Sequence, residues 1–278
     1  MTSGAVDRLT RRRNTVRMGL TRWARYVALG DSITEGLCDP VAGGGDRWLG
    51  WADRLATILD GNAQLSGKSI EFANLAVRGR RVRDVVEQQI PTALELKPEL
   101  VSVLIGGNDL MSARADPDAL AAELETGIAA LRAAGIDVLL ANCFDPQVAF
   151  FVRPFRGRAA VFNANVWSIA RTHRTYTLDL WGIRELQNVA MWSEDRVHLS
   201  SAGHRLLASR AAHTLGVPYF ELPGAEARLA PQLAGSLSTA AWLRTHAIPW
   251  VGRRLLRVSA GDGISPKLPT PITVAQSS

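Results

Sequence analysis

Four short segments of the chain contain the residue types that acyl-transfer chemistry requires. They supply a serine hydroxyl, a glycine backbone N–H, a side-chain amide, and an aspartate that stands three residues before a histidine. In chain order the segments are GDSITEG at 30–36, NLAVRG at 74–79, GGND at 106–109 and DRVH at 195–198. A serine attacks an acyl group effectively when a base takes its proton, and the intermediate needs donors for its negative oxygen. Together the segments predict one site for acyl transfer.

Three of these residues can form a catalytic triad. Ser32 would be the nucleophile, and His198 would be the base because an imidazole has an ordinary pKa near 6.5. Asp195 would hold the imidazole in the required tautomer and stabilise its cation. Ser32 lies in G-D-S-I-T rather than in a G-x-S-x-G segment, which argues against the α/β-hydrolase fold.

With this pattern the chain resembles the SGNH hydrolases, also called the GDSL family of esterases and lipases. The family is named for a serine, a glycine, an asparagine and a histidine in four blocks, which Ser32, Gly79, Asn108 and His198 match. The resemblance spans roughly residues 25–216. It implies an oxyanion hole formed by the backbone N–H groups of Ser32 and Gly79 and the side-chain amide of Asn108, with Asp195 completing the triad. The chain departs from the family pattern in two places: it has GDSI in place of GDSL, and arginines surround Gly79.

The resemblance implies an α/β fold, a three-layer α/β/α sandwich with a flavodoxin-like parallel sheet of five strands in the order 2-1-3-4-5. It also implies a serine esterase that cleaves carboxylic esters of small molecules or lipids and needs no cofactor and no metal. A thioesterase, a lysophospholipase and a carbohydrate deacetylase are alternatives of the same fold. A catalytically idle protein that binds a membrane surface is an alternative of a different class.

The hydrophobic pattern supports alternating strands and helices, which favours right-handed βαβ units. Ser32, Gly79 and Asn108 each follow one of the first three strands, which fits the rule that sites of open α/β sheets lie at the carboxyl ends of strands. We expect one helix to end at Asp60-Gly61 and another at Pro91. The expected strands are 26–29, 69–76, 100–105, 138–141 and 176–180, and the expected helices are 51–59, 82–90, 118–134, 158–172 and 201–215.

Composition fits a globular enzyme and excludes several classes. Hydrophobic residues make up 47% of the 278 positions, but no apolar run approaches the ~18 residues of a membrane-spanning helix. The two cysteines, Cys38 and Cys143, have no metal-ligand spacing and form no disulfide framework. The basic start lacks an apolar signal core, so we expect a cytoplasmic protein. Met18 is an alternative start.

The positive charge is concentrated at the ends of the chain. The net charge is +6, yet residues 1–25 alone carry +6 and residues 237–278 carry +4, which leaves about −4 for the rest. Basic ends can contact an anionic membrane, whereas a solvated arm is the alternative; we expect no specific nucleic-acid partner. The predicted division is a basic arm at 1–25, a catalytic domain at 26–216 and an extension at 217–278.

The extension has two parts. Residues 242–257 interleave tryptophans with arginines, and we expect them to dock on the acidic body or on a second subunit rather than on a membrane. Residues 261–278 contain three prolines and are expected to be an extended tail. The oligomeric state stays open.

Several residues near the motifs have expected supporting roles. Asp31 and Asp109 should brace their loops by hydrogen bonds, and His204 should be structural. The loops 38–51 and 144–155, the latter with four phenylalanines, could shape a substrate pocket or simply pack on the body. The arginines Arg78, Arg80 and Arg81 could attract an anionic substrate, but a solvated helix start is the favoured interpretation.

Overall fold

The computed structural model describes residues 22–41, 48–112, 114–147, 151–218 and 261–274. The predicted basic arm with Met18 and the tryptophan–arginine segment 242–257 lie outside the described residues. Within the described part, six strands form one sheet in the order β5-β4-β3-β1-β2-β6. The strands are β1 (Arg25–Gly30), β2 (Glu71–Asn74), β3 (Leu100–Leu104), β4 (Asp137–Ala141), β5 (Tyr176–Leu178) and β6 (Leu268–Thr273).

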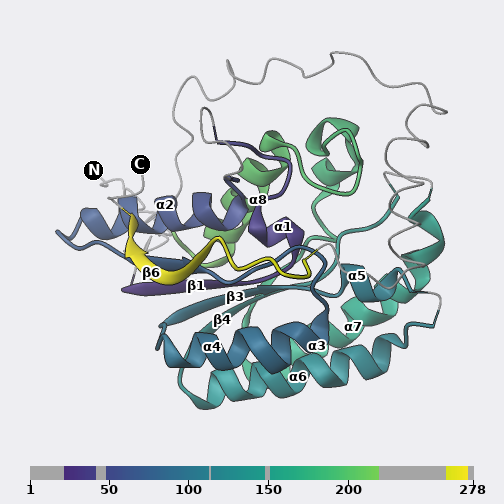
Figure 1. The fold of residues 1–278 in the computed structure, drawn as a ribbon, viewed down its shortest axis with the longest axis horizontal. Coiled ribbons are helices and arrows are strands. Elements are labelled where there is room, and N and C mark those ends of the chain that lie inside the picture. The colour runs from purple at the N-terminus through teal and green to yellow at the C-terminus, as the bar shows by residue number, and fades with distance from the viewer. Residues whose placement is uncertain (1–21, 42–47, 113, 148–150, 219–260, 275–278) are drawn as a thin grey trace, which may run out of the picture.

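Helices cover both faces of the sheet, which gives three layers (Figure 1). One face carries α1 (Ser32–Glu35), α2 (Trp51–Gln64) and α8 (Ser201–Thr214). The other carries α3 (Val82–Asp84), α4 (Ile90–Glu95), α5 (Gly107–Leu110), α6 (Pro117–Ala133) and α7 (Arg156–His173). Side chains of β1 alternate between the two cores: Tyr26 and Ala28 pack on the first, Val27 and Leu29 on the second.

The predicted α/β fold and the order 2-1-3-4-5 of the first five strands are confirmed. The prediction of a five-stranded, purely parallel sheet is wrong, because β6 pairs antiparallel with β2. Part of the predicted proline-rich tail is thus a strand. Pro269 and Pro271 are tolerated there because β6 lies at the edge of the sheet, where N–H groups on the outer side need no strand partner.

Two predicted helix ends are also wrong. The helix that starts at Trp51 continues through Asp60 and Gly61 to Gln64. The helix that starts at Val82 continues past Pro91, because the turn before the proline, Val85–Gln89, widens to π-helical hydrogen bonding. Proline lacks the N–H of a regular α-turn, so a wider turn accommodates it inside a helical segment.

The packed body begins slightly before the predicted boundary at residue 26. Trp23 is buried, and its indole N–H donates to Asp137 on β4 (2.9 Å). At the other end, β6 brings residues of the predicted extension into the central sheet. Among the described residues, no helix combines the length and the apolar character needed to cross a bilayer.

Candidate active site

The site lies where the parallel strands end. Ser32 begins α1 directly after β1, Gly79 lies in the turn after β2, and Asn108 lies in α5 after β3. Parallel neighbours place their carboxyl ends at one edge, so the three segments predicted from sequence come together there. Asp31 caps α1, and its carboxylate accepts from the Ile33 N–H (3.1 Å).

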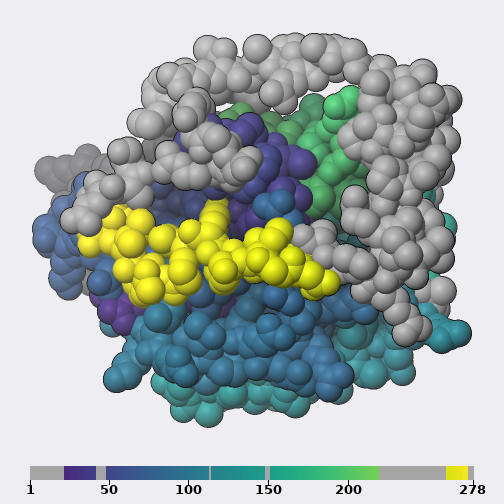
Figure 2. Space-filling model, viewed as in Figure 1, coloured from purple at the N-terminus to yellow at the C-terminus, as the bar shows by residue number. Residues whose placement is uncertain are grey.

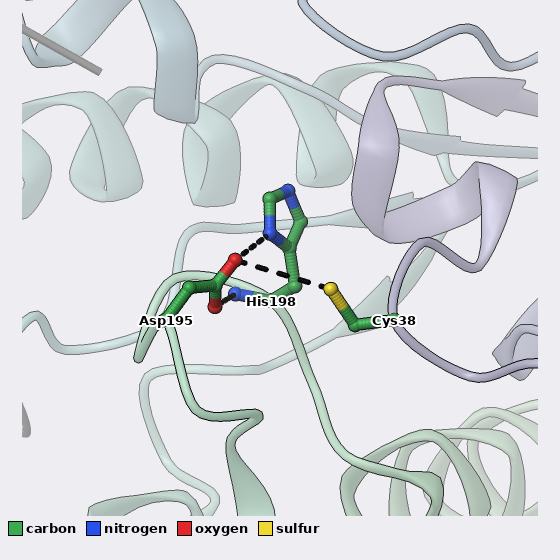
Figure 3. A group of neighbouring side chains, drawn as sticks. All are labelled: Cys38, Asp195 and His198. Carbon is green, nitrogen blue, oxygen red and sulfur yellow. Dashed lines mark hydrogen bonds and ion pairs between the residues drawn. The ribbon is translucent and has the colours of Figure 1, made fainter. Parts of the chain in front are cut away.

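Ser32, His198 and Asp195 form a continuous line of contacts. His198 Nε2 lies 2.9 Å from Ser32 Oγ, and His198 Nδ1 lies 2.5 Å from Asp195 Oδ2. Figure 3 shows the Nδ1 side of the ring facing the carboxylate. The structure therefore brings together the three residues predicted as a triad, in the order that a serine nucleophile requires.

Hydrogen bonds to the Asp195 carboxylate hold the loop that contains it. Oδ1 accepts from the Ser193 hydroxyl (2.6 Å) and from the backbone N–H groups of Val197 (2.9 Å) and His198 (3.0 Å). Burial alone would raise the pKa of Asp195, but the hydrogen bonds from His198 and Ser193 outweigh it and hold this pKa well below its usual value. For His198 burial lowers the pKa, yet the Asp195 carboxylate and Cys38 together more than compensate and raise it.

The predicted oxyanion-hole residues Gly79 and Asn108 lie in the segments that follow β2 and β3, the two neighbours of β1. Gly79 adopts a left-handed backbone (φ 76°), which a residue with a Cβ rarely adopts. The Asn108 amide nitrogen lies 3.0 Å from the Arg80 carbonyl oxygen and 3.3 Å from Asp31 Oδ2. Asn108 thus joins the loops after β1 and β2.

Asp31 and Asp109 brace the loops as predicted. Asp31 accepts from Ile33 and from the Asn108 amide, and Asp109 accepts from the Val82 N–H (3.1 Å). Burial raises the pKa of Asp31 to about 7 and that of Asp109 to about 6. The pKa values of both carboxyl groups therefore lie closer to neutrality than that of an ordinary aspartate.

Gln89 is a supporting residue that the sequence reasoning missed. Its side-chain amide bonds both backbone groups of Gly30, with distances of 2.8 Å to the N–H and 2.9 Å to the carbonyl oxygen. Gln89 thereby holds the backbone of Gly30, the last residue of β1, which lies two positions before Ser32. The nearby Pro91 is the sequence signal that could have indicated an irregular helical turn here.

The favoured interpretation of the arginines around Gly79 as a solvated helix start is wrong for Arg78, whereas Arg81, exposed at the start of α3, fits it. The backbone N–H of Arg78 donates to Glu35 Oε2 (2.7 Å), and its guanidinium forms an ion pair with the same carboxylate. Glu35 is almost fully buried. Arg80 pairs with Asp84 (3.6 Å), while Arg81 is exposed. Because Arg78 and Arg80 are each engaged by a carboxylate, the loop offers little support for an anionic substrate.

His204 is structural, as expected. It is fully buried, and its Nδ1 accepts from the Trp51 N–H at the start of α2 (3.2 Å). Burial, aided by the positive charge of Arg54, lowers the pKa of His204 to about 3. It therefore stays neutral across the working range of most enzymes and holds α8 to α2.

Cys38 lies beside the candidate triad, with its Sγ 3.9 Å from Asp195 Oδ2 (Figure 3). Among the residues described, Cys38, Asp195 and His198 form a group whose potential metal-ligand atoms all lie within 4.8 Å of one another. Because Asp195 and His198 already bond each other at 2.5 Å, a metal ion would have to displace the proton that joins them.

The predicted pocket loops are only partly described. Positions 42–47 and 148–150, including Phe150, lie outside the described residues. Phe144 packs edge-on against buried Trp192, with ring centroids 4.7 Å apart, so ordinary packing accounts for it. A cavity of about 180 Å³ lies beside the Gly79 turn. It is lined by Val77 and Arg80 on one side and by Ile264 of the C-terminal segment, residues 261–274, on the other.

A layered α/β fold with a serine, an imidazole and a carboxylate in contact at the carboxyl edge of the sheet defines a hydrolase of the SGNH type. The sequence matches the GDSL-like lipase/acylhydrolase family over residues 28–206, and the chain belongs to this family. It is an ester-hydrolysing enzyme. No curated protein matches the sequence.

Solved structures share the fold. LAE5, an alpha/beta hydrolase from the metagenome of Lake Arreo, Spain, is 24% identical with a TM-score of 0.58, over 69% of this chain and 95% of LAE5. Axe2, an acetylxylan esterase from Geobacillus stearothermophilus, is 21% identical with a TM-score of 0.59, over 71% of this chain and 96% of Axe2. Catalytic mutants of Axe2 replace a serine, an aspartate and a histidine, the last two spaced three positions apart.

Proposed function

We propose that the protein is a serine esterase that hydrolyses carboxylic esters of small molecules through an acyl-enzyme on Ser32. The observation that carries the proposal is the unbroken line from Ser32 Oγ to His198 (2.9 Å) and from His198 to Asp195 (2.5 Å). The Asp-x-x-His spacing that the chain shares with the catalytic mutants of Axe2 supports it.

In this mechanism Ser32 Oγ attacks the ester carbonyl carbon while its proton passes to His198 Nε2. The carbonyl oxygen becomes an oxyanion that accepts from the backbone N–H groups of Ser32 and Gly79 and from the Asn108 amide. Collapse of the intermediate expels the alcohol, which takes the proton from His198. Water then attacks the acyl-enzyme by the same route, releases the acid and restores Ser32.

Asn108 would serve both structure and catalysis. Its amide nitrogen carries two N–H groups, and the contact with Arg80 (3.0 Å) is shorter than the one with Asp31 (3.3 Å). We expect the N–H that faces Asp31 to donate to the oxyanion when the ester is bound, while the bond to Arg80 keeps the side chain in place. The hydrogen bond from the Asn108 amide to the substrate would then strengthen as negative charge develops on the carbonyl oxygen.

The test is covalent labelling combined with turnover. A fluorophosphonate probe should label the wild type once and leave Ser32→Ala unlabelled. Nitrophenyl esters of rising acyl length, an acyl thioester, a lysophospholipid and acetylated xylan, each measured with Ser32→Ala as the blank, would separate an esterase from the other activities of this fold. Labelling that persists in Ser32→Ala would overturn the assignment of the nucleophile.

A further inference from the structure

Lys267, in the C-terminal segment, lies next to the helix that begins with Ser32. Its ammonium nitrogen is 2.6 Å from the Glu35 carbonyl oxygen, 2.9 Å from the Trp48 carbonyl oxygen and 2.7 Å from Asp53 Oδ2. An ammonium group has three N–H donors, and here three acceptors surround it. Only a fifth of the side chain is exposed, so water cannot readily replace these partners.

The acceptors belong to the two helices that meet behind the nucleophile. Glu35 is the last residue of α1, and Asp53 lies in the first turn of α2, where its carboxylate also accepts from the Gly50 N–H (2.8 Å). An ammonium group suits both places, because the end of a helix presents unpaired carbonyls and a carboxyl oxygen of Asp53 accepts from it. Lys267 thus joins the end of α1 to the start of α2.

Glu35 extends this connection to the predicted oxyanion hole. Its backbone carbonyl accepts from Lys267, while its buried carboxylate accepts from the backbone N–H and the guanidinium of Arg78, the residue before Gly79. A shift of Glu35 would therefore move the one-turn helix of Ser32 and the turn of Gly79 together.

The C-terminal segment also contacts the Gly79 turn directly. A Cβ on Gly261 would overlap the Arg78 carbonyl oxygen, so the segment passes against this turn with no space for a side chain. Figure 2 shows residues 261–274, in yellow, lying along the surface between the layers of the sandwich. The segment lies outside the residues 28–206 that match the family.

From these contacts we propose that Lys267 is a positioning residue of the esterase site, which seats Ser32 and the Gly79 turn through Glu35. The proposal rests on the proposed function. Lys267 is placed to touch neither the ester nor the reacting atoms. Its removal should reduce the rate of the chemical step and leave substrate binding nearly unchanged.

The test compares four variants of the full chain: Lys267→Met, Lys267→Arg, Gly261→Ala and Val274→Ala. Lys267→Met keeps the length of the side chain without its charge, and Gly261→Ala pushes on the Gly79 turn from the other contact. Val274→Ala is the matched control: Val274 is buried, follows β6, and bonds Ile70 at the opposite end of the strand pair from the site. Each variant is measured for kcat, KM, melting temperature and rate of fluorophosphonate labelling.

We expect kcat and the labelling rate to fall about 10- to 100-fold in Lys267→Met and Gly261→Ala, with KM within about twofold, because small displacements of catalytic groups are costly. Val274→Ala should lower the melting temperature and keep kcat. Lys267→Arg should recover part of the lost rate because it keeps the charge.

A purely structural role for Lys267 gives a different result: a lower melting temperature with wild-type kcat and labelling rate in the folded enzyme, as in Val274→Ala. That outcome would overturn the proposal, and Gly261→Ala would still test the segment if Lys267→Met failed to fold. The proposed function fails separately, if the wild type is not labelled at Ser32 or if Ser32→Ala keeps its activity.

Discussion

The Asp195 carboxylate organises its loop as well as its imidazole. It receives three hydrogen bonds on one oxygen from within residues 193–198 and the His198 ring on the other. Arg196, inside this turn, adopts a left-handed backbone (φ 56°) that most side chains avoid. The hydrogen bonds to the Asp195 carboxylate offset this backbone strain. They also keep the carboxylate charged, so it can serve as a fixed counter-ion for the imidazolium that forms during catalysis.

The pH dependence of activity should report this pairing. Burial lowers the pKa of His198, but Asp195, together with Cys38, raises it more, and only the neutral imidazole can take the Ser32 proton. We therefore expect kcat/KM to rise with pH along a limb whose midpoint lies above the ordinary value of about 6.5. In Asp195→Asn the midpoint should move down and kcat should fall about 10²- to 10⁴-fold. Profiles of kcat/KM against pH for both proteins check this, and an unmoved midpoint would contradict it.

Asn108→Ala should separate an oxyanion donor from a loop brace. Removal of one such donor typically lowers kcat about 10²- to 10³-fold with little change in KM. Asn108→Asp should do worse, because it places a negative charge where the oxyanion forms. The measurement is kcat and melting temperature on the same preparation. A stability loss with full kcat would show that Asn108 only joins the loops through Arg80 and Asp31.

Sequence patterns identified residues whose chemistry is visible in their type and spacing. Ser32, Asp195 and His198 were predicted together because a hydroxyl, a carboxylate and an imidazole make a recognisable set. Glu35, Gln89 and Lys267 were missed for a physical reason: each binds backbone atoms of a distant segment, and any residue type supplies those atoms. Arg78 was misinterpreted because the carboxylate that its side chain binds, Glu35, lies 43 positions away.

At the scale of elements, the helical segment from Val82 to Glu95 shows how a local irregularity supports the site. A regular α-helix would lack a hydrogen bond at Pro91, and the π-turn at Val85–Gln89 absorbs that loss. The widened turn ends at Gln89, whose amide pairs with Gly30. Sequence rules predicted a helix end at the proline because they treat each segment alone, whereas packing on the sheet stabilises the continuation.

Gln89→Leu should destabilise the protein through β1. It would leave the buried N–H of Gly30 without its partner, which costs about 1–3 kcal/mol of unfolding free energy, and would leave the Gly30 carbonyl with only the Val77 N–H at 3.4 Å. Gln88→Leu is the control, because Gln88 is exposed on the same turn. Urea denaturation of both variants gives the comparison. Equal midpoints would show that water replaces the Gln89 amide.

At the scale of the whole molecule, the sheet combines a parallel core with one antiparallel edge strand. The five parallel strands were predictable because they are short apolar runs between helices. β6 was not, since two prolines weaken its pattern and nothing local indicates that β2 is its partner. β6 covers an edge of β2 that would otherwise present free backbone groups. The predicted division at residue 217 stays a prediction, with β6 joining the two parts.

Ending the chain at residue 260 should uncover that edge. Loss of the β6 hydrogen bonds and of buried Val274 should lower the melting temperature by roughly 5–10 °C. An exposed β2 edge should also promote self-association. Thermal melts and sedimentation at several concentrations test both effects. A truncated protein that stayed monomeric with an unchanged melting temperature would show that β6 contributes little to the sheet.

The contact between Lys267 and Glu35 also has a consequence for biosynthesis. The two residues are 232 positions apart, so their contact closes one of the longest loops in the chain. Contacts of such separation form late, after the local helices and neighbouring strands that make them possible. A nascent chain that has emerged through residue 206 already contains Ser32, Asp195 and His198, yet it lacks Lys267, the residue proposed to position Ser32 and the Gly79 turn. On the proposed role of Lys267, full hydrolytic activity would arise only once the last strand has been synthesised and has docked on β2.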